Sequence, residues 1–229
     1  MQLLESIDIF PVILTLAAFQ IGRLCQKKWK LPIFNPTLIG MVLVTLFVVV
    51  SGMNPEGYTS GTKLIFWLMT PATISLAVPM YEQFQILKKS LKAVLAGVFA
   101  GALSCMLMIV AVSLLLKFDR SVMISLMPKS VTTAIGMSLS EMFGGMGGVT
   151  VAAIIVTGIG GNMMGPMLCK LFGIHDQVAQ GVAFGTAAHV IGTAKANELS
   201  ELTGAASSLS LVVAGLLTAV FMPIIAAFL

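Results

Sequence analysis

Hydrophobic residues form long runs in this chain, separated by short polar connectors. Runs such as LIGMVLVTLFVVV (residues 38–50) lack the alternation of apolar and polar residues that is typical of a transmembrane β-strand. An α-helix satisfies its own backbone hydrogen bonds, as the interior of a bilayer requires. The pattern therefore predicts an all-α integral membrane protein, a polytopic bundle of about 7–8 transmembrane segments.

Some of the predicted segments are interrupted. Those at residues 63–81, 122–143 and 178–199 contain proline, glycine or charged residues, and whether 122–143 spans the membrane or re-enters it stays open. The other predicted segments lie at residues 9–22, 33–50, 91–116, 149–172 and 205–229.

The composition supports a membrane protein, since 58% of the 229 residues are hydrophobic and only 10% are charged, against about 25% in soluble domains. The net charge of +4 comes from lysines and arginines that lie mostly in connectors. Two basic clusters, Arg23–Lys30 and Lys88–Lys92, are separated by two predicted crossings, so both are expected on the cytoplasmic side. The charge therefore reports orientation and gives no indication of nucleic-acid binding.

The whole chain, residues 1–229, is expected to form one transmembrane domain. PTLIGM (residues 36–41) resembles TTAIGM (residues 132–137), which suggests repeat units at about 33–116 and 122–199 in opposite orientations. Inverted repeats are typical of secondary transporters. Chance similarity in a glycine-rich apolar chain is the alternative.

The segment MPKSVTTAIGMSLSE (residues 127–141) carries the first candidate site. Lys129, Ser130, Thr132 and Thr133 directly follow Pro128. A proline followed by hydroxyl residues is typical of a helix N-terminus, whose free N–H groups and positive dipole end attract anions. The alternative is that Lys129 merely extends from a helix end to the membrane interface.

The segment FGTAAHVIGTAKANE (residues 184–198) carries the second candidate site. On a continuous helix, Thr186, His189, Thr193 and Asn197 would share one face. Ionisable residues inside a membrane segment usually mark a functional path, and His189 is the candidate for proton coupling. The alternatives are that His189 binds a backbone carbonyl, and that Gly185 and Gly192 unwind the helix.

Asn162 is a further candidate lining residue, inside the glycine-rich stretch at residues 144–165. Close helix packing is the simpler explanation for the glycines of that stretch.

Catalysis and metal binding have little support in the sequence. No nucleophile elbow, His-Glu-x-x-His pair or phosphate-binding loop occurs. His175 and His189 have no nearby set of cysteines and carboxylates that would complete a zinc site. We therefore expect a protein that is not an enzyme, without a metal or other cofactor.

Three motifs carry a resemblance to a known family. AVPMYEQ (77–83), MPKSVTTAIGMSLSEMFGG (127–145) and FGTAAHVIGTAKANELSELTGAASSLSLVVAGLLTAVFMP (184–223) closely resemble the LrgB/CidB family of multi-pass bacterial inner-membrane proteins. The resemblance covers nearly the whole chain. It departs at Ala134, where the family motif has proline, a residue that would favour a helix break.

The resemblance implies two rival functions. One is a holin-like or antiholin-like protein that affects murein hydrolase activity and autolysis with a small LrgA/CidA-type membrane partner. The other is transport of small carboxylates, because the family is similar to the C-terminal half of the plastid glycolate/glycerate translocator.

The polar residues at membrane depth favour the second function, a secondary transporter of small monocarboxylates or hydroxycarboxylates, such as glycolate or pyruvate, across the bacterial inner membrane. A small organic anion would bind Lys129, Ser130, Thr132, Thr133, Thr186, His189, Thr193 and Asn162. The alternative is a pore-forming or regulatory protein of the holin/antiholin type. Glycine-rich faces are also compatible with a homodimer.

Overall fold

The computed structural model describes residues 9–29, 34–75 and 77–228. Within these ranges the regular structure consists of helices, and no strand occurs. Four of the helices, α2, α7, α10 and α12, are long and apolar enough to cross a membrane, and α3 is a shorter apolar helix. The prediction of a polytopic, all-α membrane protein is confirmed.

The chain divides into two compact units, Met1–Ser75 and Leu76–Leu229. The first unit contains α2 (Ile9–Trp29), α3 (Pro36–Ser51), α4 (Pro55–Gly61) and α5 (Lys63–Ser75). The interrupted segment predicted at residues 63–81 is divided between α5 and α6 (Ala77–Glu82), and residue 76 lies outside the described residues.

Local sequence explains where the helices of the first unit begin. The Asn35 side chain accepts a hydrogen bond of 2.9 Å from the backbone N–H of Thr37, and Pro36 occupies the first helical position of α3. Asn54 and Pro55 repeat this arrangement at the start of α4. Between α2 and α3, Gly22 allows the α3 backbone to approach closely, and a Cβ there would lie 2.8 Å from the Pro36 Cα.

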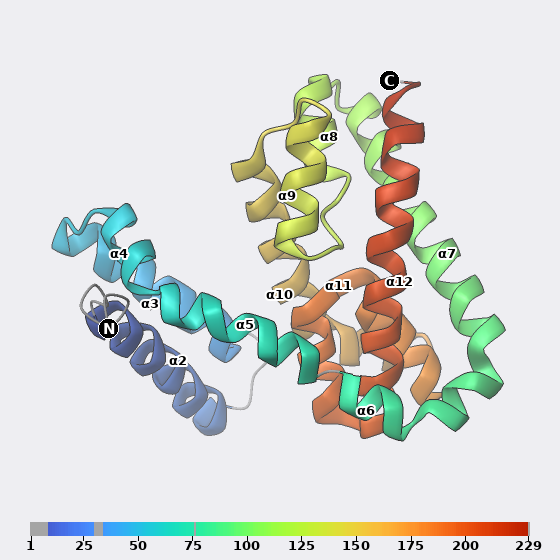
Figure 1. The fold of residues 1–229 in the computed structure, drawn as a ribbon, viewed down its shortest axis with the longest axis horizontal. Helices are drawn as coiled ribbons and strands as arrows, with labels where there is room; N and C mark the ends of the chain where they lie inside the picture. The colour runs from blue at the N-terminus through green and yellow to red at the C-terminus, as the bar shows by residue number, and fades with distance from the viewer. Residues whose placement is uncertain (1–8, 30–33, 76, 229) are drawn as a thin grey trace. The chain divides into compact units, whose positions relative to one another are not determined.

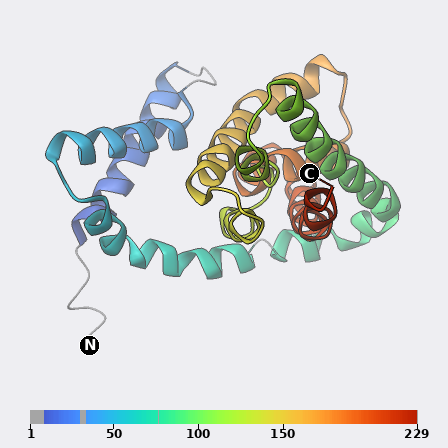
Figure 2. The same cartoon turned by 90° about the horizontal axis from the view of Figure 1, so that it is seen from above.

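The second unit contains three long helices. They are α7 (Phe84–Leu115), α10 (Gly147–Leu171) and α12 (Glu201–Ala226), and the shorter elements are α6, α8 (Arg120–Leu126), α9 (Thr133–Met142) and α11 (Gln177–Leu199). With 32, 25 and 26 residues, the long helices exceed the roughly 20 residues that a bilayer crossing needs. Figure 2 shows α9 between α10 and α12.

Helices α8 and α9 form a hairpin that enters the second unit and returns to the same end. Arg120, at the start of α8, donates a 3.2 Å hydrogen bond to the carbonyl oxygen of Ala226 at the end of α12. Met127, after α8, packs in the core against side chains of α7 and α12. The chain then returns along α9, and the backbone N–H of Met146 donates to Ser125 Oγ at 2.7 Å. The segment predicted at residues 122–143 is therefore re-entrant.

Helix α11 also reverses direction, because its backbone leaves the helical conformation at His189 (φ 43°, ψ −137°). Before the break, Gly181 lies against Thr203 of α12, and a Cβ on this glycine would be 2.5 Å from the Thr203 carbonyl oxygen. After the break, Asn197 lies against Gly204. In a straight helix, residues 181 and 197 would be about 24 Å apart, so they cannot contact adjacent residues of α12 unless the chain turns back.

The two hairpins enter from opposite ends of the second unit. The α8–α9 hairpin starts beside the C-terminal end of α12, whereas the α11 hairpin starts and ends beside its N-terminal end (Figure 1). Each hairpin is followed by one long helix, α10 or α12. This order repeats within the second unit with inverted direction, whereas the repeat predicted at 33–116 and 122–199 stays a prediction.

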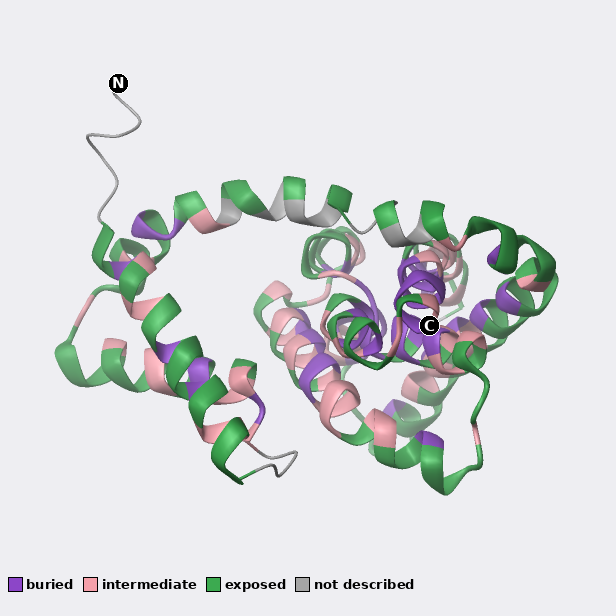
Figure 3. Ribbon diagram, turned by 90° about the horizontal axis from the view of Figure 1, so that it is seen from below, coloured by how far each residue is buried: buried purple, intermediate pink, exposed green. Residues whose placement is uncertain are grey.

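The second unit buries small residues and exposes large apolar ones. Thr203, Ser207 and Ser210 of α12 are fully buried, whereas Leu216 of the same helix is 66% exposed. Figure 3 shows the buried residues inside this unit and exposed residues on its outer faces. Small residues between helices with large apolar residues outside are typical of a bundle surrounded by lipid.

Candidate functional site

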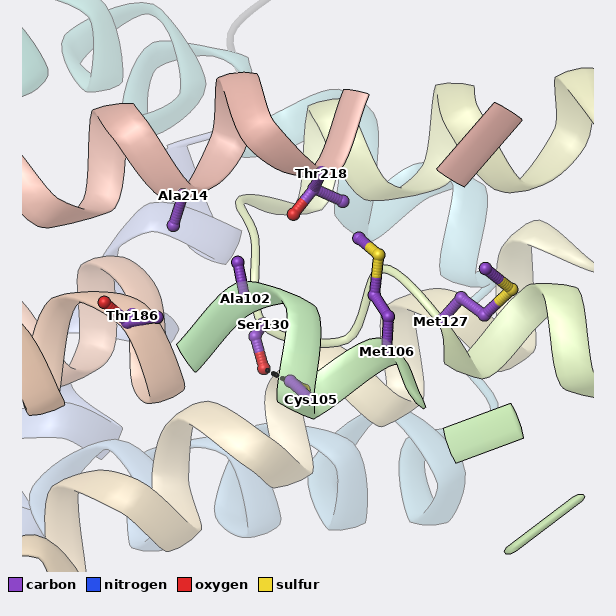
Figure 4. Close-up of a pocket in the computed structure, with 8 residues that line it drawn as sticks. All are labelled: Ala102, Cys105, Met106, Met127, Ser130, Thr186, Ala214 and Thr218. Atoms are coloured by element: carbon purple, nitrogen blue, oxygen red, sulfur yellow. Dashed lines mark hydrogen bonds between the residues drawn. The ribbon is translucent and has the colours of Figure 1, made fainter. Parts of the chain in front are cut away.

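The tips of the two hairpins meet beside α7 and α12, around a small cavity. Its volume is about 10 Å³, which is room for about one water molecule. The lining residues come from α7, the tip of the first hairpin, α11 and α12 (Figure 4), and they are Ala102, Cys105, Met106, Met127, Ser130, Thr186, Ala214 and Thr218.

The tip of the α11 hairpin is held by hydrogen bonds from His189 and Thr193. The His189 ring forms a hydrogen bond of 3.0 Å between its Nε2 and the carbonyl oxygen of Ile154 in α10. Thr193 Oγ1 donates to the His189 carbonyl oxygen at 3.0 Å and lies 2.8 Å from Ser207 Oγ of α12. A non-glycine residue at this backbone conformation costs about 1–3 kcal/mol, and these hydrogen bonds, at about 1 kcal/mol each, offset that cost.

Glycines of α10 let the tip of the α11 hairpin approach its backbone. A Cβ on Gly158 would lie 2.7 Å from His189 Nε2. Gly161 faces Ala188 in the same way. Nearby, Asn162 Nδ2 donates to the carbonyl oxygen of Ile191 at 2.9 Å, so Asn162 connects α10 to the residues just after the break.

The tip of the first hairpin, residues 127–132, makes fewer side-chain hydrogen bonds to other helices, although Met127 and Val131 are buried in the core. Ser130 Oγ lies 3.2 Å from Cys105 Sγ of α7, a distance at which either atom donates. Lys129 is half-buried and Thr133 is exposed. Thr132 is the N-cap of α9, but its side chain makes no capping hydrogen bond. One sulfur–hydroxyl contact is a weaker attachment than the bonds that hold the α11 tip.

The structure therefore separates the predicted site residues into three groups. Ser130 and Thr186 line the cavity, whereas His189, Thr193 and Asn162 bond neighbouring helices. Lys129, Thr132 and Thr133 belong to the turn before α9 and to its first residue.

One prediction about this arrangement is wrong. Thr186, His189, Thr193 and Asn197 do not share the face of a continuous helix, because the helix breaks at His189. The break lies at the histidine itself, whereas Gly185 and Gly192, the predicted points of unwinding, pack against α12 and the preceding turn.

Two lining residues that carry an S–H or O–H group, Cys105 and Thr218, were not among the predicted site residues. Cys105 lies in a continuous apolar run, and Thr218 lies in the last predicted span without a polar neighbour. In Figure 4 the Thr218 hydroxyl points toward the space between α12 and α7. Thr186 Oγ1 is buried and has no hydrogen-bond partner within the described part of the chain.

Comparison with known proteins identifies the relatives of this chain. The model of the LrgB-like family matches residues 15–228. The chain is 29% identical to the holin-like protein CidB of Staphylococcus epidermidis, over 95% of both chains. It is 32% identical to the antiholin-like protein LrgB of Bacillus subtilis over 94% of both chains, and 33% identical to that of Bacillus cereus over 93% of this chain. No solved structure matches.

These relatives correct the functional prediction. The prediction of a carboxylate transporter is wrong, because the relatives have holin-like and antiholin-like names, which agree with the alternative. The geometry gives a physical reason, since His189 and Thr193 already bond other parts of the protein instead of presenting free donors to an anion. The protein is a multi-pass membrane protein, and by its match over residues 15–228 the chain belongs to the LrgB-like family.

Proposed function

We propose that this protein is an antiholin-like regulator of membrane permeability. It acts with a small LrgA/CidA-type membrane protein and thereby affects murein hydrolase activity and autolysis. The names and the nearly full-length coverage of the LrgB and CidB relatives support this proposal. The small membrane partner is inferred from the family resemblance, and its interaction with this protein is part of the proposal.

The closed centre of the second unit supports a regulatory role and argues against a pore within this unit. The cavity between the hairpin tips has room for about one water molecule. Met106 and Met127, both almost fully buried, fill the side toward the end of α12. A solute path through this unit would need the hairpin tips to separate.

The predicted site residues have a role in this proposal. His189, Thr193 and Asn162 fix the second hairpin tip, while Ser130 and Lys129 lie on the first tip, which has fewer side-chain hydrogen bonds to other helices. We therefore assign the responsive movement to residues 127–132, with the α11 hairpin as the fixed side.

A dye-leak assay tests the proposed function. Vesicles loaded with a self-quenching dye would contain this protein, the small partner, or both at several ratios. An antiholin-like regulator is expected to lower the leak rate caused by the partner, without causing leak alone. An unchanged partner leak at every ratio would contradict the proposal, and leak from this protein alone would favour a holin-like pore.

A disulfide between the first hairpin tip and α7 tests the assigned movement. Ser130→Cys places a second sulfur beside Cys105, in a protein whose Cys25 and Cys169 are replaced by serine. Oxidation is expected to abolish the effect on partner leak, and reduction is expected to restore it. The matched control is the same protein with Ser130 retained, which oxidation should leave active. An oxidised disulfide variant that still regulates the partner would refute the movement.

A further inference from the structure

Helix α7 is longer than a bilayer crossing requires. Its 32 residues extend about 48 Å, whereas the hydrocarbon core is about 30 Å thick. Lys88, Lys89 and Lys92 lie in its first part, and the remaining residues, 93–115, are uncharged and span about 35 Å. The first turns of α7, residues 84–92, therefore belong at the level of the lipid headgroups.

The lysines of these turns share one side of the helix. At 100° per residue, Gln85, Lys88, Lys89 and Lys92 cover an arc of about 100°, and we call this set the lysine face. All four side chains are exposed. Leu87, which is only 3% exposed, lies on the opposite side and packs against Ala205 and Ala206 of α12. The lysine face therefore points away from the core of its unit.

No salt bridge joins the lysine face to a carboxylate within the described residues. Within the described residues, the only salt bridge joins Lys195 and Glu198. The lysines also lie near the N-terminal end of α7, where the helix dipole is positive, and the N-cap residue Gln83 makes no side-chain capping bond. This region therefore concentrates positive charge that no salt bridge within the described residues balances.

Exposed aromatic residues accompany the lysine face. Tyr81 is 83% exposed and Phe84 is 54% exposed. Aromatic side chains beside lysines are typical of the membrane–water interface, where the rings lie at headgroup level and the cations attract anionic lipids. A dissolved anion would use the lysines but would have no need of the rings.

We propose that the lysine face of α7 is a binding site for anionic phospholipid, with Lys88, Lys89 and Lys92 contacting the headgroup phosphate. This inference is independent of the proposed regulatory function, because it concerns a different surface and a different readout.

Native mass spectrometry tests the site on the full chain, released from detergent micelles that contain phosphatidylglycerol, phosphatidylcholine or both. The protein is expected to retain phosphatidylglycerol preferentially. The variant K88Q/K89Q/K92Q is expected to lose roughly fivefold in affinity per lysine, on the order of 100-fold in total. Phosphatidylcholine binding should not change, and K88R/K89R/K92R should keep the preference.

The matched control, K63Q/K117Q/K170Q, removes the same charge from scattered exposed positions. It should retain phosphatidylglycerol as the unmodified protein does. Equal losses in both glutamine variants would overturn the proposal, because net charge alone would then explain binding. Equal competition by soluble glycerol phosphate would overturn it in favour of a dissolved anion. If the triple variant does not fold, Lys88→Gln, Lys89→Gln and Lys92→Gln test the fivefold effects singly.

Discussion

Substitution of His189 by alanine and by glycine tests the reversal of α11 directly. Both variants lose the imidazole ring and its hydrogen bond to the Ile154 carbonyl, so the two proteins differ only by one Cβ at residue 189. Any difference in stability between them reports the backbone conformation at that residue.

The expected difference follows from the backbone angles. In an ordinary helix, glycine is about 1 kcal/mol less stable than alanine. At φ 43° and ψ −137°, a side chain costs about 1–3 kcal/mol in the folded state. The greater freedom of glycine in the unfolded chain opposes this by about 0.4–1 kcal/mol. We therefore expect His189→Gly to be more stable than His189→Ala, by about 1–2 kcal/mol.

Equilibrium unfolding by denaturant in detergent micelles measures the two free energies of unfolding. Ala187→Gly is the matched control, because Ala187 is exposed and helical two residues before the break. This control should lose about 1 kcal/mol relative to the unmodified protein. If His189→Ala is as stable as His189→Gly or more so, residue 189 is helical and the proposed reversal is refuted.

Two further predictions follow from the same fold. In a cysteine-free background, single cysteines at positions 176 and 201 should react with a membrane-impermeant maleimide from the same side of the membrane, because α11 returns to its starting side. A single cysteine at position 119 should react from the other side. Labelling of positions 176 and 201 from opposite sides would show that α11 spans the membrane. Gly181→Ala should lower the free energy of unfolding by about 1–3 kcal/mol, because its Cβ would lie 2.5 Å from the Thr203 carbonyl oxygen. Gly160→Ala, with open space around residue 160, should be neutral or stabilising. Equal effects of the two substitutions in thermal unfolding would contradict the close contact of α11 with α12.

Much of the candidate site was predictable from residue type. Lysine, histidine and hydroxyl residues in apolar segments mark costly positions, and this pattern selected Ser130 and Thr186, which line the cavity, and His189, Thr193 and Asn162, which bond other helices. Their function was not predictable, because a hydroxyl that binds an anion and one that binds a neighbouring helix have the same sequence pattern.

The hydrophobic pattern alone determined that the chain is a helical membrane protein, because lipid leaves few ways to satisfy backbone hydrogen bonds. Local signals also placed helix starts such as that of α3, where Asn35 and Pro36 supply the cap and the first residue. These features depend on residues adjacent in sequence.

Only the tertiary structure decided the reversal at His189. No glycine or proline occupies that position, and the strained backbone persists because distant residues hold it. Ile154 accepts the hydrogen bond of the ring, Gly158 makes space for it, and Ser207 fixes Thr193. These partners lie 35, 31 and 18 residues from His189 along the chain, so no local sequence pattern predicts the break. The hairpin forms because the packed bundle compensates a conformation that the isolated segment would not adopt.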